Sequence, residues 1–228
     1  MKIKILYEDS NILAIDKPSG ILVHPDGRNE DPSAKLKAKE TILDLFIKKY
    51  PKVEVVHRLD RDTSGVMLLA KNAKAHEFLK KQFMDRSIKK NYHTIVSGFV
   101  KNDHATINKP IGRSPKDFRR HLAGRGVRGE LREAITEYRV LKRFEILSQK
   151  FSYLEIHPKT GRTHQIRVHM KFINHPVICD SLYNPNGPCI KGLNRLALHA
   201  RSIEFKDLKG KVIKVESPLP KEFKKVLK

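Results

Sequence analysis

The segment VVHRLDRDTSGVMLLAKN, residues 55–72, places charged residues directly before an apolar run. Asp60 or Asp62 could cap the turn, with Arg58 and Arg61 simply solvated. Alternatively, a carboxylate at the entrance of a buried strand is held rigidly, and the neighbouring arginines favour its ionised form. An ionised, positioned aspartate suits nucleophilic catalysis or metal binding. The spacing alone leaves both interpretations open.

Two other residue types raise the possibility of a metal site. His57, His164 and His169 have no paired acid between them, and their spacing matches no common metal site. Cys179 and Cys189 lack the companions that a zinc site needs. We therefore expect no metal. Because the chain has only two cysteines, we also expect it to work in the reducing interior of the cell, the cytosol.

The net charge indicates the class of partner. The 228 residues include 47 Lys+Arg against 25 Asp+Glu, which gives a net charge of +22 and a pI near 10.0. A polyanion is the expected partner, and nucleic acid is favoured over an anionic membrane because no segment reads as a basic amphipathic helix. A generally lysine-rich proteome would also give a basic chain. The first residues are too interrupted by charge for a signal peptide, and no segment approaches the length of a membrane span.

The densest basic stretch contains RSPKDFRRHLAGRGVRG, residues 113–129. It is rich in glycine and lacks helix or strand periodicity, so we predict a mobile loop. Such a loop could be merely solvated, but arginines at this density on a basic protein favour contact with phosphates. The candidates for contact with the phosphate backbone of a nucleic acid are Arg113, Arg119, Arg120, Arg125 and Arg128.

Strand patterns outnumber helical patterns without strict alternation, which favours an α+β fold with a mixed or antiparallel sheet. The apolar run at 65–71 fits a central strand, and Asn72 fits the N-cap of a helix that follows it. If Thr163 caps a later helix, Arg167 lies on its polar face, which could also be an ordinary solvated surface. We expect strands at 3–9, 11–18, 65–71, 91–100, 132–144, 151–159 and 195–205, and helices at 40–50, 75–83 and 161–173.

Several long motifs together resemble one known family. HRLDRDTSGVMLLAKN is similar to the signature of the RluA-type pseudouridine synthases, and HPKTGRTHQIRVHM is similar to their second highly specific motif. The other matching segments, in the family's order, are ILYEDSNILAIDKPSGILVHP, KKNYHTIVSG, HPVICDSLY, RLALHARSIEF and SPLPKEF. The resemblance covers nearly the whole chain, from about Ile5 to about Phe223.

The resemblance implies roles for four residues. Asp60 falls on the catalytic aspartate, which would attack C6 of the target uridine or C1′ of its ribose, or abstract the 2′ proton. Tyr92 falls on the tyrosine that stacks on the flipped base. Arg167 falls on the arginine that pairs with this aspartate, and Arg58 on the arginine that enters the RNA stack in place of the flipped base.

The resemblance also implies the architecture and the partners. It implies a mixed, mostly antiparallel sheet in two lobes with flanking helices and a central catalytic cleft. Residues 1–228 would form the catalytic domain, with no separate N-terminal RNA-binding domain, so the basic loop would help to dock RNA. Neither a cofactor nor a metal is implied, and we expect a cytoplasmic monomer that modifies rRNA or tRNA.

The sequence departs from the family pattern at Cys179-Asp180, where a Gly-Asp pair is usual. The turn before Asp180 could therefore differ, and we interpret Cys179 as a buried, inert thiol. At Asp16 the family more often has asparagine, which we expect to matter little.

Two other classes of function stay open. An idle RNA-binding or RNA-chaperone protein on the same fold is disfavoured by the intact Asp60, Tyr92 and Arg167. A metal-dependent nuclease would need a second carboxylate cluster, which the sequence lacks. Treating RNA with and without EDTA separates a nuclease from an isomerase, because isomerisation should not need metal.

Overall fold

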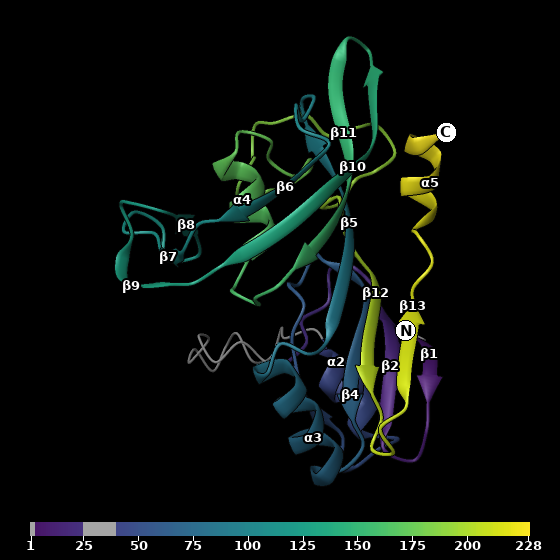
Figure 1. The fold of residues 1–228 in the computed structure, drawn as a ribbon. Coiled ribbons are helices and arrows are strands. Elements are labelled where there is room, and N and C mark those ends of the chain that lie inside the picture. The colour runs from purple at the N-terminus through teal and green to yellow at the C-terminus, as the bar shows by residue number, and fades with distance from the viewer. Residues whose placement is uncertain (1–2, 25–39) are drawn as a thin grey trace, which may run out of the picture. The chain divides into compact units, whose positions relative to one another are not determined.

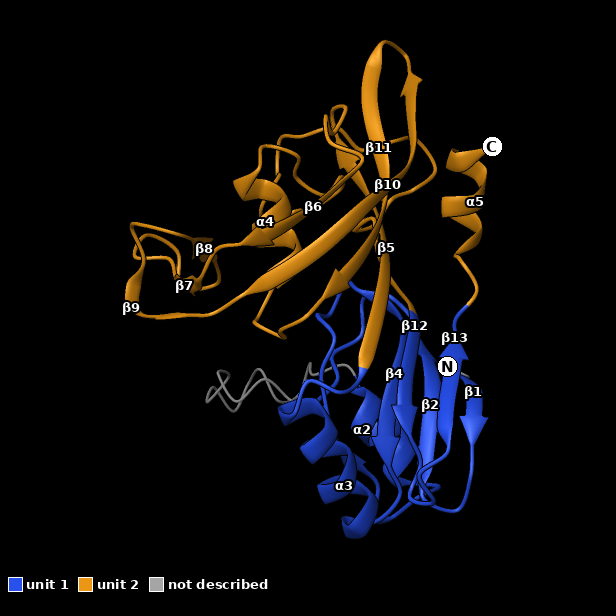
Figure 2. Cartoon of the chain, in the orientation of Figure 1, with its two compact units in different colours: residues 1–88, 202–217 blue, residues 89–201, 218–228 orange. Residues whose placement is uncertain are grey.

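The computed structural model describes residues 3–24 and 40–228, and the chain divides into two compact units (Figure 2). Pro25, the last residue of the first family-like segment, lies outside the described residues. Unit 1 comprises residues 1–88 and 202–217, and unit 2 comprises residues 89–201 and 218–228. Among the described residues, no helix is long and apolar enough to cross a membrane.

Unit 1 is built around an antiparallel arrangement of strands (Figure 1). Strand β2 pairs with both β1 and β4, β3 pairs with β4, and β13 pairs with β12. Every residue of β4 is buried, which confirms the prediction of a central strand in the run after Gly65. The elements are β1 (Lys4–Glu8), β2 (Ile12–Lys17), α2 (Ile42–Ile47), β3 (Glu54–Val55), β4 (Ser64–Ala70), α3 (Ala73–Met84), the later part of β12 (Leu198–Lys206) and β13 (Val212–Glu216).

The helices of unit 1 begin where local sequence signals place them. Thr41 and Asp44 form a reciprocal capping box at the start of α2. Asn72 caps α3 as predicted, because its side-chain oxygen accepts a hydrogen bond from the backbone N–H of Ala75 at 2.9 Å. These short-range contacts fix the segments on either side of residues 55–72.

Unit 2 contains antiparallel strands in the order β5-β11-β10-β6 and a separate three-stranded sheet in the order β8-β7-β9. Its core is made by apolar side chains of β5, β11 and the helix α4 together with those of the segment 177–198. The elements are β5 (Lys89–Ser97), β6 (His104–Asn108), β7 (Ile111–Arg113), β8 (His121–Ala123), β9 (Arg128–Arg132), β10 (Ile135–Ile146), β11 (Gln149–Pro158), α4 (Gln165–Phe172), residues 198–201 of β12 and α5 (Lys221–Leu227).

The fold class is therefore the predicted one, α+β with a large, mostly antiparallel arrangement of strands and few helices. Two local predictions need correction. The arginine-rich stretch 113–129 is irregular over most of its length, as predicted, but it also contains the end of β7, all of β8 and the start of β9. Cys179 is not a free thiol, because it forms a disulfide with Cys189, and this removes the basis on which cysteine usage suggested a reducing interior.

Candidate active site

Asp60 lies in a turn of unit 1 that leads into β4. The backbone N–H of Thr63 donates to the Asp60 carbonyl at 3.1 Å, which closes the turn. Gly65 then adopts a φ of 111°, a conformation that residues with a side chain rarely adopt. The aspartate is half-buried and enters a strand that is entirely buried, so its backbone is fixed from both sides.

Lys17 anchors this turn from the neighbouring segment of unit 1. Its side chain is completely buried, and its Nζ donates to the carbonyl oxygens of Pro18, Arg61 and Thr63 at 3.0, 2.9 and 2.8 Å. A buried ammonium group needs such partners, because an unpaired one would be very costly. Ser19 adds a hydrogen bond from its hydroxyl to the carbonyl of Asp62 at 2.6 Å. No local pattern in the sequence indicates this role, although Lys17 lies in the family-like segment AIDKPSG.

Replacing Lys17 by methionine should lower the free energy of unfolding by about 2–4 kcal/mol, because buried carbonyl groups lose a charged donor. Urea unfolding measures this loss. Ser19→Ala is the matched control, since it removes one hydrogen bond from the same turn and should cost about 1 kcal/mol. A Lys17→Met protein as stable as the parent would show that the ammonium group does not hold the turn.

His57 has a structural role in the same segment. Its Nε2 accepts a hydrogen bond from the backbone N–H of Leu68 at 2.9 Å, which requires the unprotonated form of that nitrogen. Its ring also stacks on Phe83, with centroids 4.6 Å apart.

Within residues 3–24 and 40–228, no group of three His, Cys, Asp or Glu side chains is arranged to hold a metal ion.

Arg58 is exposed on the turn that carries Asp60. Arg61 is also exposed, and its Nε lies 3.2 Å from Oδ1 of Asp62. An exposed pair of this kind contributes little to stability. The Asp62 carboxylate thus has an ionic partner next to it in the chain.

Tyr92 lies in β5 of unit 2, opposite Ile156 of β11. Its side chain is half-buried and packs against the core of unit 2. Part of the Tyr92 side chain is therefore used in core packing, and part stays accessible. A half-buried aromatic ring on a strand is rigid and still offers area for stacking.

Arg167 lies in α4 of unit 2 and is only 6% exposed, so the alternative of a solvated helix surface is wrong at this position. Its Nε donates to Oδ2 of Asp180 at 2.7 Å and its Nη2 donates to Oδ1 at 2.8 Å. Such a bidentate pair fixes the plane of the guanidinium. The guanidinium carbon also lies 5.0 Å from the centre of the Tyr183 ring.

Asp180 is the partner that the sequence analysis missed. Its carboxylate is 1% exposed, and its Oδ1 also accepts hydrogen bonds from the backbone N–H groups of Leu182 and Tyr183, both at 2.9 Å. Burial alone would raise the pKa of this carboxyl, but the hydrogen bonds and charge of Arg167 and the two backbone donors lower it below its usual value. The signal in the sequence was its position in the family-like segment HPVICDSLY.

The start of α4 differs from the prediction. The N-cap is His164, with a left-handed φ of 57°, and not Thr163. The side chain of Gln165 organises the preceding turn, since its Oε1 accepts from the Arg162 N–H at 3.0 Å and from the Thr160 hydroxyl at 2.7 Å. Gln165 thus holds the turn before α4, while no side chain caps the first N–H groups of the helix.

The histidines of α4 also have protein partners. Nδ1 of His164 lies 2.9 Å from the hydroxyl of Tyr183, which accepts a second hydrogen bond from the His121 N–H at 2.9 Å. His169 is fully buried between the Thr136 hydroxyl and the Lys109 carbonyl, and burial lowers its pKa. These contacts favour structural roles over metal binding.

The arginine-rich segment forms the small sheet of unit 2, which we name the basic sheet and define as residues 111–132. Arg119 forms a bidentate pair with Asp117, with Nε–Oδ1 and Nη2–Oδ2 distances of 3.0 and 2.9 Å, and Arg120 lies 3.4 Å from the same carboxylate. Hydrogen bonds from Arg119 lower the pKa of Asp117 to about 2. The predicted backbone-contact residues Arg113, Arg119, Arg125 and Arg128 are exposed, and Arg120 is half-buried.

Comparisons with known proteins match the chain to one family. Residues 11–172 match a family model described as RNA pseudouridylate synthase. The protein named ribosomal large subunit pseudouridine synthase D from Xanthomonas campestris is 36% identical over 99% of this chain and 68% of its own length. An uncharacterized RNA pseudouridine synthase from Aquifex aeolicus is 43% identical over 79% of this chain and 56% of its own length. The solved structure of human RNA pseudouridylate synthase domain containing 4 aligns with a TM-score of 0.76 at 25% identity, covering 98% of this chain and 91% of that one.

Proposed function

From the membership of this chain in the RNA pseudouridylate synthase family, which makes it an enzyme that isomerises uridines in RNA, we propose that Asp60 is its catalytic carboxylate. The observation that carries the proposal is the anchored turn of unit 1. Lys17 and the backbone hydrogen bond from Thr63 hold this turn before a fully buried strand. A fixed carboxylate meets the geometric demand of nucleophilic or proton-transfer catalysis.

The proposed roles of three further residues follow the family motifs. Tyr92 would stack on the flipped uracil, and its half-buried ring is a support for this role. Arg167 would pair with Asp60, and its bidentate bond to Asp180 would set the direction of the guanidinium. Arg58 would enter the RNA stack at the position of the flipped base, which suits an exposed arginine on the same turn as Asp60. Flipping a base costs a few kcal/mol, which stacking and edge contacts must offset.

The proposed substrate is RNA of the large ribosomal subunit. Relatives from Xanthomonas campestris and Borreliella burgdorferi are named as synthases of that subunit, at 36% and 38% identity. Transfer RNA is the alternative. Mapping pseudouridines in total RNA from a deletion strain against its parent distinguishes the two, because the missing positions identify the substrate.

The reaction is proposed to need neither metal nor cofactor, and the enzyme to act as a monomer in the cytoplasm. Turnover by the purified protein should therefore be unchanged in EDTA. Sedimentation should give a mass close to 26.3 kDa. Loss of turnover in EDTA would contradict the metal-independent route.

We propose that the basic sheet docks RNA through phosphate contacts. Phe118, which precedes Arg119 in the sequence, is 74% exposed and could stack on an unpaired base. A phosphate would have to compete with Asp117 for Arg119 and Arg120, because both already lie near that carboxylate. The pairing with Asp117 therefore holds the two arginines in place but lowers their affinity for RNA phosphates.

Changing Arg119 and Arg120 together to serine should weaken RNA binding and flatten the slope of log K against log salt by up to about two units, since fewer counterions are released. Asp117→Asn is the matched control with the opposite sign, because it frees both arginines and should tighten binding. Folding should change little, because the pair of Arg119 with Asp117 is exposed and the side chain of Arg120 is 39% exposed. Binding measured across a salt series decides the question, and an unaltered slope in both variants would show that the basic sheet is merely solvated.

A further inference from the structure

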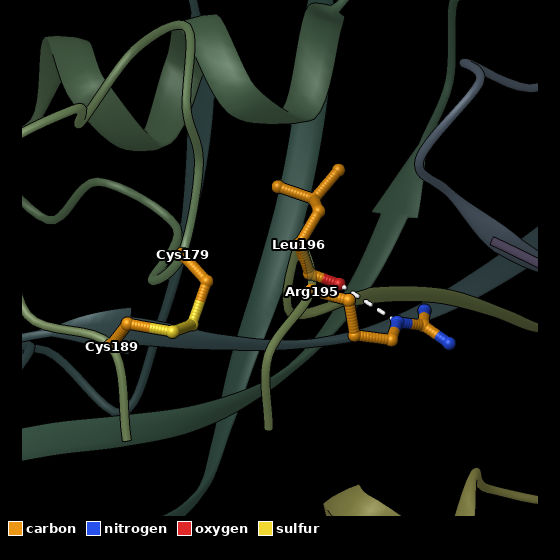
Figure 3. Close-up of a disulfide and its surroundings, with 4 residues drawn as sticks. All are labelled: Cys179, Cys189, Arg195 and Leu196. Carbon is orange, nitrogen blue, oxygen red and sulfur yellow. Dashed lines mark hydrogen bonds between the residues drawn. A yellow bond between two sulfur atoms is a disulfide. The ribbon is translucent and has the colours of Figure 1, made fainter. Parts of the chain in front are cut away.

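The disulfide lies in the segment that follows α4 in unit 2. It joins Cys179 to Cys189, ten residues apart in sequence, with Cα atoms 4.7 Å apart (Figure 3). The enclosed sequence DSLYNPNGP contains two prolines and one glycine, which break regular structure. Cys179 is half-buried and Cys189 is exposed, so a small reductant can reach the bond.

Cys179 has an unusual backbone conformation. Its φ is 55°, in the left-handed region that residues with a Cβ atom rarely adopt. A residue in this region is disfavoured and persists only where its surroundings impose the conformation. The disulfide is a covalent constraint on this residue. The backbone N–H of Cys179 also donates to the Pro188 carbonyl, but at the long distance of 3.4 Å.

The residue after Cys179 is Asp180, the bidentate partner of Arg167. The carboxylate of Asp180 also accepts hydrogen bonds from the backbone N–H groups of Leu182 and Tyr183, so it organises the segment that the disulfide encloses. The ring of Tyr183 lies against the guanidinium of Arg167. A change of backbone direction at Cys179 would therefore move the groups that fix Arg167.

We propose that the Cys179–Cys189 disulfide is a positioning device for the reaction: it holds Cys179 in the left-handed conformation, and so keeps Asp180 and Tyr183 in place around Arg167. This inference rests on the proposed role of Arg167 in catalysis. The disulfide acts through Asp180, which follows Cys179 directly in the chain. Opening it lowers the rate of the chemical step and leaves binding of RNA to the basic sheet intact.

The first experiment compares Cys189→Ala with the parent under multiple-turnover conditions, at a temperature where circular dichroism shows both to be folded. We expect kcat to fall about tenfold with KM unchanged, since small misplacements of a catalytic group are costly. Treating the parent with dithiothreitol should reproduce the effect, because exchange converts the disulfide to two thiols while the reagent is oxidised to its cyclic disulfide. Parental kcat in both samples overturns the proposal.

A rescue variant separates positioning from general loosening. In Cys179→Gly/Cys189→Ala, glycine adopts a positive φ at little cost, so no covalent constraint is needed there. This double variant should recover most of the parental kcat, although, like Cys189→Ala, it lacks the disulfide. If both variants are equally impaired, the disulfide does not act through the conformation of Cys179, and the proposal fails.

A third comparison distinguishes failure of this inference from failure of the proposed function. Arg167→Lys keeps the charge but cannot form the bidentate pair, so it should lower kcat, and adding Cys189→Ala to it should have little further effect. If Arg167→Lys has parental kcat, the proposed role of Arg167 fails. If Arg167→Lys is impaired and Cys189→Ala still lowers kcat by its full factor, the proposed function stands and the positioning proposal is overturned.

Discussion

Replacing Asp60 by asparagine is expected to reduce pseudouridine formation by more than about a thousandfold, because the amide cannot act as a nucleophile or accept the ribose proton. Binding of RNA should survive. Removing one negative charge from a chain of net charge +22 does not weaken attraction to phosphates. Single-turnover assays on a uridine-containing RNA fragment, together with a filter-binding titration, measure the two effects separately.

Asp62→Asn is the matched control for this experiment, because it removes the same charge from the same turn. The Asp62 carboxylate forms an exposed pair with Arg61, so its loss should change neither stability nor turnover appreciably. Substantial turnover by Asp60→Asn would remove Asp60 from the nucleophile's role. Equal loss in both variants would show that the charge of the turn matters and not the individual carboxylate.

The parts of the fold that the sequence predicted depend on short-range patterns. The apolar run of β4 and the cap at Asn72 are local signals, and the structure confirms both. The strands of the basic sheet were missed because β7 and β8 have three residues each, too few for a period of two to be recognised. The pairing of these short strands depends on contacts between segments that are apart in the sequence, and not on the local preference of each residue.

The site was predicted in its residue types but not in its contacts. The family motifs indicated Asp60 and Arg167, and the sequence could not supply the partners that hold them. Lys17 lies more than forty residues from the carbonyls of the Asp60 turn that it binds, and Asp180 lies thirteen residues from Arg167, beyond the end of α4. Such pairs are brought together by the tertiary fold. The disulfide was missed for a similar reason, since its geometry depends on the turn between the two cysteines.

Replacing Arg167 by methionine is expected to have a large effect on both turnover and stability. The variant leaves the buried carboxylate of Asp180 without its cation, and breaking a buried pair in this way costs about 3–5 kcal/mol. Turnover should fall by at least about a hundredfold, because the proposed partner of Asp60 is also lost. Affinity for RNA should change much less, since Arg167 is buried and the basic sheet is intact.

The dependence on pH gives this prediction a distinct signature. In the parent, the pKa of Asp180 is lowered, so the pair stabilises the fold above the pKa of the unfolded carboxyl and loses that contribution as pH falls through the folded value. In Arg167→Met, burial without a cation should raise the pKa of Asp180 above its ordinary value. The stability deficit relative to the parent should therefore be largest at neutral pH and shrink as pH falls through this raised pKa.

A double variant separates folding from catalysis. Asp180→Asn added to Arg167→Met removes the unpaired charge, so it should recover a large part of the lost stability. It should also remove the part of the pH dependence that comes from the raised pKa of the unpaired carboxyl, and leave only the loss of the parent's own pair at lower pH. It should not restore turnover, because no cation has been returned to the site. Chemical denaturation at several pH values and single-turnover assays on the same preparations give both results. A double variant that regains parental turnover would show that Arg167 serves only to neutralise Asp180, and an Arg167→Met protein with parental stability and turnover would remove the arginine from both roles.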